Sequence, residues 1–302
     1  MSEYHIPVLL QEILKYFQVK PGKIYIDGTL GGGSHSIEIC KQGGKILGID
    51  ADTDALSYVK KRLIDEKSCK LGDHIIIANG NFRNIDILAK AYDFKNVDGI
   101  LLDLGVSSHQ IDEDTRGFSF SKDGPLDMRM DRKLAVSAKD LINGLTNGEL
   151  HELFTKLGEE RFARVISNNI IRARGIKPIV TTEELARLIE AAYGIRNRIA
   201  TAREKAMVDS KVFQALRIAV NDELNALKEA LPKSLSLLKP GGRMAVISFH
   251  SLEDRIIKEQ FLLFEKNGYG KILTKRPIVP SHQEIRSNRR SRSAKLRVLE
   301  KI

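Results

Sequence analysis

The sequence predicts an α/β protein in which a parallel β-sheet, covered by helices, is interrupted by a helical insertion. Two observations lead to this fold class. The first hundred residues alternate short apolar runs with helical patterns, which is typical of β-α-β units. This alternation then stops over residues 112–205, where turn-rich and helical segments contain no convincing strand, and a clear strand pattern returns only near residue 243.

Four strands are expected in the first half of the chain, each a short apolar run bounded by turn residues, over residues 24–27, 45–49, 74–78 and 97–102. Helices are expected near residues 36–42 and 53–63. Aspartates stand at three of the strand ends. Because ligands of parallel sheets bind at the carboxyl ends of the strands, we expect a shared site at Asp27, Asp50 and Asp103.

The sequence pattern in the second half of the chain predicts one long helix and three more strands. Apolar residues recur at helical spacing from Val208 to Leu231, which indicates a single amphipathic helix. Pro240-Gly241-Gly242 predicts a turn, and strands are expected over residues 243–249, 271–274 and 295–299. Two domains follow from this pattern: a discontinuous sheet domain over residues 1–111 and 206–302, and a helical insertion over residues 112–205.

Composition narrows the class of protein. The hydrophobic fraction of 42% and charged fraction of 29% exclude a mostly disordered chain. No apolar run is long enough to span a bilayer, and the first residues lack the pattern of a secretory signal. Only two cysteines are present, Cys40 and Cys69, so we expect ordinary cysteines and a reducing, cytoplasmic location. No Cys/His cluster has zinc-ligand spacing, and no metal is expected.

Basic residues gather near the C-terminus. The net charge is +10, and residues 271–301 hold ten Lys or Arg against two acids. This density is typical of a surface that binds a polyanion such as RNA, although a solvated basic surface accounts for it equally well. Four arginines are candidates for phosphate contacts, with no ranking among them: Arg129, Arg289, Arg290 and Arg292.

A glycine-rich turn follows the first strand and opens a helix, which predicts a nucleotide-type site over residues 27–33. Asp50 lies nineteen residues after Gly31, where an acid accepts hydrogen bonds from both ribose hydroxyls. NAD and S-adenosylmethionine both fit. The glycine spacing departs from G-x-G-x-x-G, and the Asp27 carboxylate repels a pyrophosphate but attracts a sulfonium and an ammonium, so S-adenosylmethionine is favoured. Phe82 is a candidate to pack on the adenine, or equally a core residue.

Several longer blocks of sequence then become specific. They are Leu101–Ser108, Arg116–Phe120, Asp123–Met130, Gly158–Phe162, Phe213–Ile218, Val246–Arg255 and Arg292–Arg297. Together with residues 5–10 they closely resemble the 16S rRNA (cytosine-N(4)-)-methyltransferase family over essentially the whole chain. The resemblance implies a Rossmann-like, S-adenosylmethionine-dependent methyltransferase sheet with a helical substrate-recognition insertion. It also implies methylation of the exocyclic amine of a cytidine in the decoding region of 16S rRNA.

The resemblance carries the family's cofactor positions to Gly33, Ser34, His35, Asp50, Phe82, Asp103 and Gln110. It implies 16S rRNA or the small ribosomal subunit as partner, with no membrane association; monomer and homodimer both stay open. The chain departs from the family at Ser34, where Gly is usual, and at His109, where Pro is usual. Met207-Val208-Asp209-Ser210-Lys211 stands where His-Pro-Ala-Thr-Arg is usual, so a lysine replaces a bidentate arginine.

Asp103 is the leading candidate for the catalytic group. The exocyclic nitrogen of cytosine is a poor nucleophile, and an acceptor on its N–H localises the lone pair and takes the released proton. A purely cofactor-binding role for Asp103 is equally consistent, and Asp127 is a second, weaker candidate. Phe118 and Phe120 are candidates for stacking on a flipped-out base, although core packing is favoured for at least one of them.

Other reactions fit the sequence less well. Methylation at cytosine C5 usually needs a Cys nucleophile, and neither cysteine lies near the fourth strand. His250-Ser251 with Glu253-Asp254 contains the residue types of a hydrolase, but adjacent residues after a strand point in different directions, which favours a strand-to-helix turn. An NAD(P)-dependent oxidoreductase is disfavoured by the glycine spacing. A non-catalytic RNA-binding assembly factor on the same fold is the main alternative.

Overall fold

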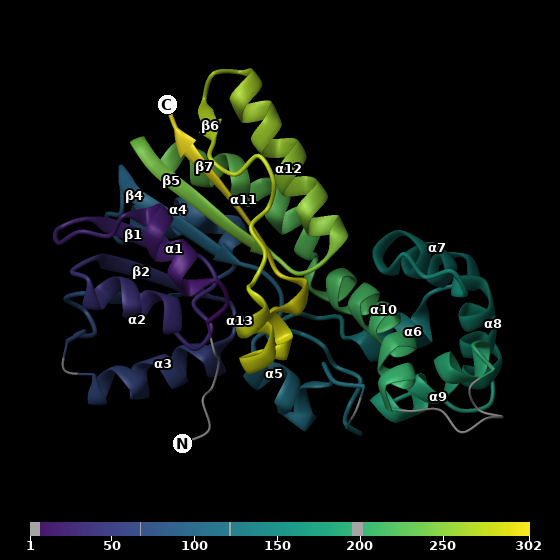
Figure 1. Cartoon of the computed structure of the whole chain (residues 1–302). Coiled ribbons are helices and arrows are strands. Elements are labelled where there is room, and N and C mark those ends of the chain that lie inside the picture. The colour runs from purple at the N-terminus through teal and green to yellow at the C-terminus, as the bar shows by residue number, and fades with distance from the viewer. Residues whose placement is uncertain (1–6, 67, 121, 195–201) are drawn as a thin grey trace. The chain divides into compact units, whose positions relative to one another are not determined.

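The computed structural model describes residues 7–66, 68–120, 122–194 and 202–302. The N-terminal residues considered above, including His5 and Ile6, lie outside this description. The chain divides into two compact units, which are described separately below (Figure 1). Unit 1 comprises Met1–Ser107 and Leu224–Ile302, and unit 2 comprises Ser108–Glu223.

Unit 1 is built on a seven-stranded sheet with the order β3-β2-β1-β4-β5-β7-β6. The strands are β1 (Ile24–Asp27), β2 (Lys45–Asp50), β3 (Ile75–Asn79), β4 (Val97–Asp103), β5 (Leu238–Ser248), β6 (Gly270–Ile272) and β7 (Lys295–Lys301). The first five run parallel, whereas β7 is antiparallel to both β5 and β6. The predicted α/β fold class is confirmed, with a mixed sheet rather than a wholly parallel one.

Two apolar clusters, one on each face of the sheet, form the core of unit 1. Side chains alternate along each strand, so Tyr25 packs into one cluster and Ile26 into the other. One face is covered by α1 (Leu10–Phe17), α2 (Ser34–Lys41) and α3 (Thr53–Asp65). The other is covered by α4 (Ile85–Ala91), α11 (Glu223–Leu237) and α12 (Ser251–Lys266). Short helical segments complete the unit: η1 (Phe82–Asn84), α13 (His282–Ser287) and η4 (Arg289–Ser293).

Unit 2 is helical over its described residues. It contains α5 (Ser108–Asp112), η2 (Asp114–Arg116), α6 (Ala138–Gly144), α7 (Asn147–Gly158), α8 (Ala163–Arg174), α9 (Thr182–Ala192) and α10 (Ala202–Asn221). Capping boxes start three of these helices, at Ser137, Thr146 and Thr181. Helix α10 packs against α7 and α9, so the unit ends at Glu223 and not at the expected residue 205.

The single helix expected over Val208–Leu231 is wrong. The chain breaks at Asp222, whose φ of 49° lies in the left-handed region, and α11 then continues through Pro232 to Leu237. The turn expected at residues 240–242 is also wrong, because β5 already begins at Leu238. Residues 239–242 lie within β5 at an irregularity, where the register against β4 shifts between the pairs Val97–Leu238 and Gly99–Arg243.

Cys40 and Cys69 form a disulfide, contrary to the expectation of two ordinary cysteines. The two cysteines are separated by 29 positions in the sequence, and the chain between them includes β2 and α3, which return it to the same face of the sheet as α2. Their Cα atoms lie 6.0 Å apart, within the range that a disulfide requires. Among the helices within the described ranges, none combines the length and apolarity needed to cross a bilayer.

Candidate functional site

Three aspartates lie at the carboxyl ends of neighbouring strands, as the strand pattern predicted. Asp27 is the last residue of β1, Asp50 of β2 and Asp103 of β4. The register aligns β1 with both neighbours, since Asp27 faces Gly48 on one side and Leu101 on the other. The three carboxyl groups therefore share one edge of the unit 1 sheet.

The glycine-rich turn is held against the second strand by Asp50. The Gly31 N–H donates to Asp50 Oδ2 over 2.7 Å, and the Asp52 N–H donates to Asp50 Oδ1 over 2.8 Å. Gly33 precedes α2 with a φ of 74°, a conformation that glycine adopts without steric cost. The turn and the acid predicted to hold a ribose are thus one hydrogen-bonded unit.

Asp27 lies beneath this turn and is almost completely buried. Its carboxylate accepts hydrogen bonds from Ser36 Oγ at 2.7 Å and from the Thr29 N–H at 3.2 Å. Burial raises the pKa of Asp27 to about 6, against the opposing effect of these hydrogen bonds. Burial likewise raises the pKa of Asp50 to about 6, although two backbone N–H groups favour its charged form.

Asp103 faces the buried imidazole of His35. His35 Nε2 donates to the Val8 carbonyl oxygen over 3.0 Å, which leaves Nδ1 3.7 Å from Asp103 Oδ2. Burial lowers the pKa of His35 to about 4, so the ring is neutral at pH 7. Burial, followed by the negative charges of Asp27 and Glu253, raises the pKa of Asp103 well above its usual value. Asp103 therefore retains a proton more readily than an exposed aspartate does.

Ser34, where the resemblance implies glycine, makes a specific contact. Arg62 Nη1 on α3 donates to Ser34 Oγ and to the Gly32 carbonyl oxygen, each over 2.9 Å. The Ser34 side chain therefore adds a hydrogen bond between α3 and the glycine-rich turn. Phe82 begins η1, is partly buried and packs against the core, and its Cβ lies beside Gly28 of the turn.

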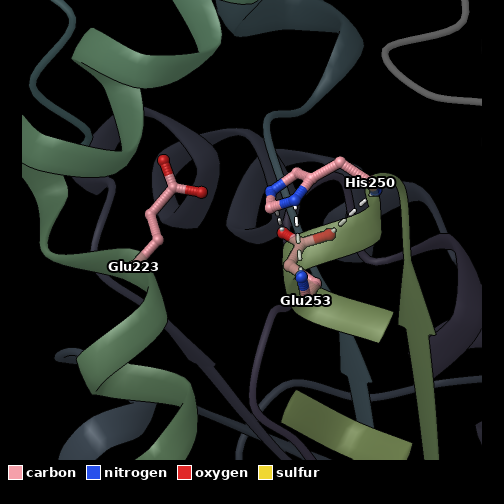
Figure 2. A group of neighbouring side chains, drawn as sticks. All are labelled: Glu223, His250 and Glu253. Atoms are coloured by element: carbon pink, nitrogen blue, oxygen red, sulfur yellow. Dashed lines mark hydrogen bonds and ion pairs between the residues drawn. The ribbon is translucent and has the colours of Figure 1, made fainter. Parts of the chain in front are cut away.

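His250 and Glu253 form the N-terminal cap of α12. The Glu253 N–H donates to His250 Nδ1 over 3.4 Å, and the Phe249 N–H donates to Glu253 Oε2 over 2.8 Å. His250 Nε2 lies 3.1 Å from Glu253 Oε1 (Figure 2). The strand-to-helix turn predicted for this segment is confirmed.

The remaining predicted residues belong to unit 2. Gln110 is buried in α5. Asp127 holds Arg129 through two hydrogen bonds of 2.8 and 2.7 Å. Partial burial raises the pKa of Asp127, but the Arg129 guanidinium outweighs it and the net shift is downward. This ion pair engages the Asp127 carboxylate and leaves it a poor proton acceptor.

Other unit 2 candidates also have structural partners within that unit. Phe118 is buried beneath the guanidinium of Arg116, and Phe120 packs edge-on against Phe213 with ring centroids 5.6 Å apart. Lys211, where the resemblance implies arginine, donates from Nζ to the Glu159 carbonyl oxygen over 2.9 Å. The sequence favoured core packing for at least one of the two phenylalanines, and the structure places Phe118 in the core.

Three residues around the site were not identified as site residues from sequence. Glu253 influences the charge state of Asp103, Ser36 hydrogen bonds to Asp27, and Arg62 holds the turn. Only Ser36 carried a usable signal, since it lies on the first turn of the helix that the glycines open. Glu253 is distant in sequence from Asp103, whose pKa it influences, and Arg62 is distant from the turn that it contacts. Buried carboxyl groups around a glycine-rich turn suit a ligand that carries positive charge, because desolvated carboxylates gain most from a cationic partner.

Comparison with known proteins identifies the chain's relatives. The model of the MraW methylase family matches residues 2–302. Ribosomal RNA small subunit methyltransferase H of Carboxydothermus hydrogenoformans is 45% identical, with 100% of this chain and 99% of that protein covered. The protein of the same name from Heliobacterium modesticaldum is 43% identical, with both chains covered completely. A putative methyltransferase from Streptococcus mutans, solved in complex with SAH, is 12% identical with a TM-score of 0.44, and 98% of this chain and 99% of that one are covered.

Proposed function

The chain belongs to the MraW methylase family, and we propose that it methylates the exocyclic amino nitrogen of a cytidine in the decoding region of 16S rRNA. S-adenosylmethionine is the methyl donor in this proposal. Full-length relatives named for methylation of small-subunit ribosomal RNA support the class of substrate. The choice of cytidine and of its amino nitrogen rests on the sequence resemblance described above.

The observation that carries the proposal is the buried carboxyl cluster at the strand ends. Asp27, Asp50 and Asp103 give a sulfonium and an ammonium group three acidic neighbours at one sheet edge. Asp50 is fixed by the turn and keeps unused lone pairs for ribose hydroxyls. Gly33, Ser34, His35, Phe82 and Gln110 are the other proposed cofactor-binding residues. When bound, S-adenosylmethionine supplies an electrophilic methyl group.

Asp103 is the proposed catalytic residue. Burial raises the pKa of Asp103 toward neutral pH, so its carboxylate is a stronger base than that of an ordinary aspartate. It accepts the N–H of the cytosine amine, which localises the nitrogen lone pair, and it takes the proton that the nitrogen loses. The neutral His35 ring donates to the Val8 carbonyl oxygen from Nε2, so its unprotonated Nδ1 donates no hydrogen bond to Asp103 and the ring does not neutralise the carboxylate.

Mass spectrometry of nucleosides tests this function. Small ribosomal subunits that lack the modification are incubated with the protein and S-adenosylmethionine and then digested. The expected product co-elutes with authentic N4-methylcytidine. Asp103→Asn is expected to lower kcat at least about 100-fold, the range that general acid–base groups contribute. Binding of both the cofactor and the subunit without any methylated product contradicts the proposal and supports an assembly factor.

A further inference from the structure

A pocket of ≈ 300 Å³ lies at the carboxyl edge of the unit 1 sheet, next to the strand that carries Asp103. Phe249 and His250 in its wall directly follow β5. Strand β5 pairs in parallel with β4, and Ile247 of β5 faces Asp103 of β4. The pocket therefore opens one strand away from the proposed catalytic carboxyl, and it is distinct from the glycine-rich turn.

The lining of the pocket combines an apolar wall with positive charge. Phe249, Val279 and Ala294 form apolar walls, while Arg292 and Lys295 supply two cations. Serine hydroxyls are also present, and none of the eight residues that line the pocket is acidic. This composition contrasts with the carboxyl cluster beside β1, β2 and β4. It suits a ligand with a flat apolar face and a negative charge.

Arg292 is the cation that is free to bind such a ligand. Its side chain is exposed and makes no hydrogen bond or ion pair within the described parts of the chain. Lys295 is partly engaged, because its Nζ lies 3.5 Å from Asp254 Oδ2. Asp254 is itself paired with Arg297 at 2.6 Å, so it neutralises Lys295 only in part.

The backbone around Arg292 is firmly anchored. Ser291 is fully buried and donates from Oγ to the Asn288 carbonyl oxygen over 2.8 Å. Ala294 on the other side is also buried. Paired backbone hydrogen bonds of 2.9 and 2.8 Å between Ile278 and Leu296 fix the chain next to Val279. The pocket is thus preformed, and binding there does not need a loop to become ordered.

We propose that this pocket binds one nucleotide of the RNA substrate other than the methylated cytidine, with the base against Phe249 and Val279 and the phosphate at Arg292 and Lys295. The proposal rests on the proposed function, since it assumes an RNA that reaches Asp103. A single nucleotide fits because stacking on an aromatic face needs no particular base and a phosphate needs cations nearby. The pocket thereby holds the RNA strand while the target base lies at the neighbouring strand.

A pair of matched variants tests the pocket. Arg292→Ala removes an exposed arginine that lines it, and Arg289→Ala removes an exposed arginine of the same short helix that does not. With a short single-stranded RNA, Arg292→Ala is expected to weaken binding about tenfold, the loss expected for one charge-assisted hydrogen bond. Its slope of log affinity against log salt is expected to fall by about 0.7. Arg289 lies outside the pocket and is expected to act on RNA only through screened long-range attraction, so Arg289→Ala is expected to change affinity less than about twofold.

Photocrosslinking of RNA that contains 4-thiouridine gives an independent readout. Crosslinks are expected at Phe249 or Val279 in the wild-type protein and are expected to weaken in Arg292→Ala. Equal effects of the two arginine variants on RNA binding, or crosslinks elsewhere only, overturn the pocket. An Arg292→Ala defect seen with assembled subunits but not with naked RNA also overturns it and indicates a ribosomal protein as the partner.

Methyl transfer and RNA binding are scored separately, so the two proposals fail in different ways. If the wild-type protein methylates the RNA and the two arginine variants do not differ, the pocket proposal is contradicted and the proposed function is supported. If RNA binds at Arg292 but no methyl transfer occurs, the pocket proposal is supported and the proposed function is contradicted. In the expected outcome, Arg292→Ala raises KM for the RNA while kcat and cofactor affinity stay unchanged.

Discussion

Two regions of unit 1 carry opposite charge, and the charged groups of one are buried whereas those of the other are exposed. The strand-end carboxyl groups of Asp27, Asp50 and Asp103 are largely buried and have raised pKa values. The arginines of η4, Arg289, Arg290 and Arg292, are exposed. Buried charges interact strongly at short range and are poorly screened by salt, whereas exposed charges act weakly and are screened within a Debye length. The first region therefore suits a small cationic cofactor, and the second suits a long polyanion.

Removal of Asp50 is expected to have the largest effect on the acidic region. Asp50→Ala deletes a carboxylate that organises the turn and is proposed to hold a ribose, so cofactor affinity is expected to fall between about 10- and 100-fold. Isothermal titration calorimetry measures this change. Asp52→Asn is the matched control, because the Asp52 side chain caps α3 by accepting from the Asp54 N–H and is not a proposed cofactor contact. A comparable loss of cofactor affinity in the control would show that general destabilisation explains both.

Salt is expected to separate the two regions next. If the basic residues within 271–301 contact four phosphates of a single-stranded RNA, doubling the salt concentration weakens RNA binding about sevenfold. Cofactor affinity is expected to change less than about twofold over the same range, because its carboxyl partners are shielded from solvent. Fluorescence anisotropy for the RNA and calorimetry for the cofactor give the two slopes. Equal slopes would mean that burial does not distinguish the regions.

The pH dependence is expected to be smaller and to affect only the acidic region. Protonated Asp27 and Asp50 lose their attraction for a cation, and the pKa of each lies at about 6. Cofactor affinity is therefore expected to rise about fourfold for each carboxyl between pH 5.5 and pH 7. Arginine does not titrate in this range, so the contribution of η4 to RNA binding is expected to stay constant. Cofactor affinity that falls as the pH rises would contradict the assignment of these carboxylates.

The same raised pKa values affect stability with the opposite sign. An aspartate whose pKa is higher in the folded state holds its proton more tightly there than in the unfolded chain. Stability from Asp27 and Asp50 is therefore greatest below pH 4, and it is lost as the pH rises from the usual aspartate value to about 6. A bound cation is expected to reverse this loss, so the rise in melting temperature on adding cofactor should be larger at pH 7 than at pH 5.

Sequence patterns predicted the strands with their terminal aspartates but missed the features that depend on distant contacts. Apolar residues keep their helical spacing on both sides of Asp222, and Asp222 itself is neither Gly nor Pro. No local signal therefore marked the break between α10 and α11. The predicted helix ended at Leu231, yet α11 continues through Pro232 to Leu237. The Cys40–Cys69 bond was likewise invisible, since spacing alone does not show that α3 returns the chain to α2.

The site shows the same division between local and distant information. The glycine-rich turn and Asp50 follow one another along the chain, so sequence spacing was enough to link them. The pairing of His35 with Val8 and the influence of Glu253 on Asp103 join residues that only the folded sheet brings together. The two basic residues of the pocket were visible only as charge, because the sequence does not show that Arg292 faces a pocket and Arg289 does not.

The discontinuity of unit 1 also sets the order in which the protein takes shape during synthesis. Strand β4 ends at Asp103, but its partner β5 begins only at Leu238, after all of unit 2 has been made. Unit 2 is contiguous and can fold first, while the β4 edge of the growing sheet still lacks its neighbour. An unpaired edge strand is prone to association with other chains. We therefore expect mutations that slow the folding of unit 2 to prolong exposure of the β4 edge in the nascent chain and to raise aggregation without altering the finished protein.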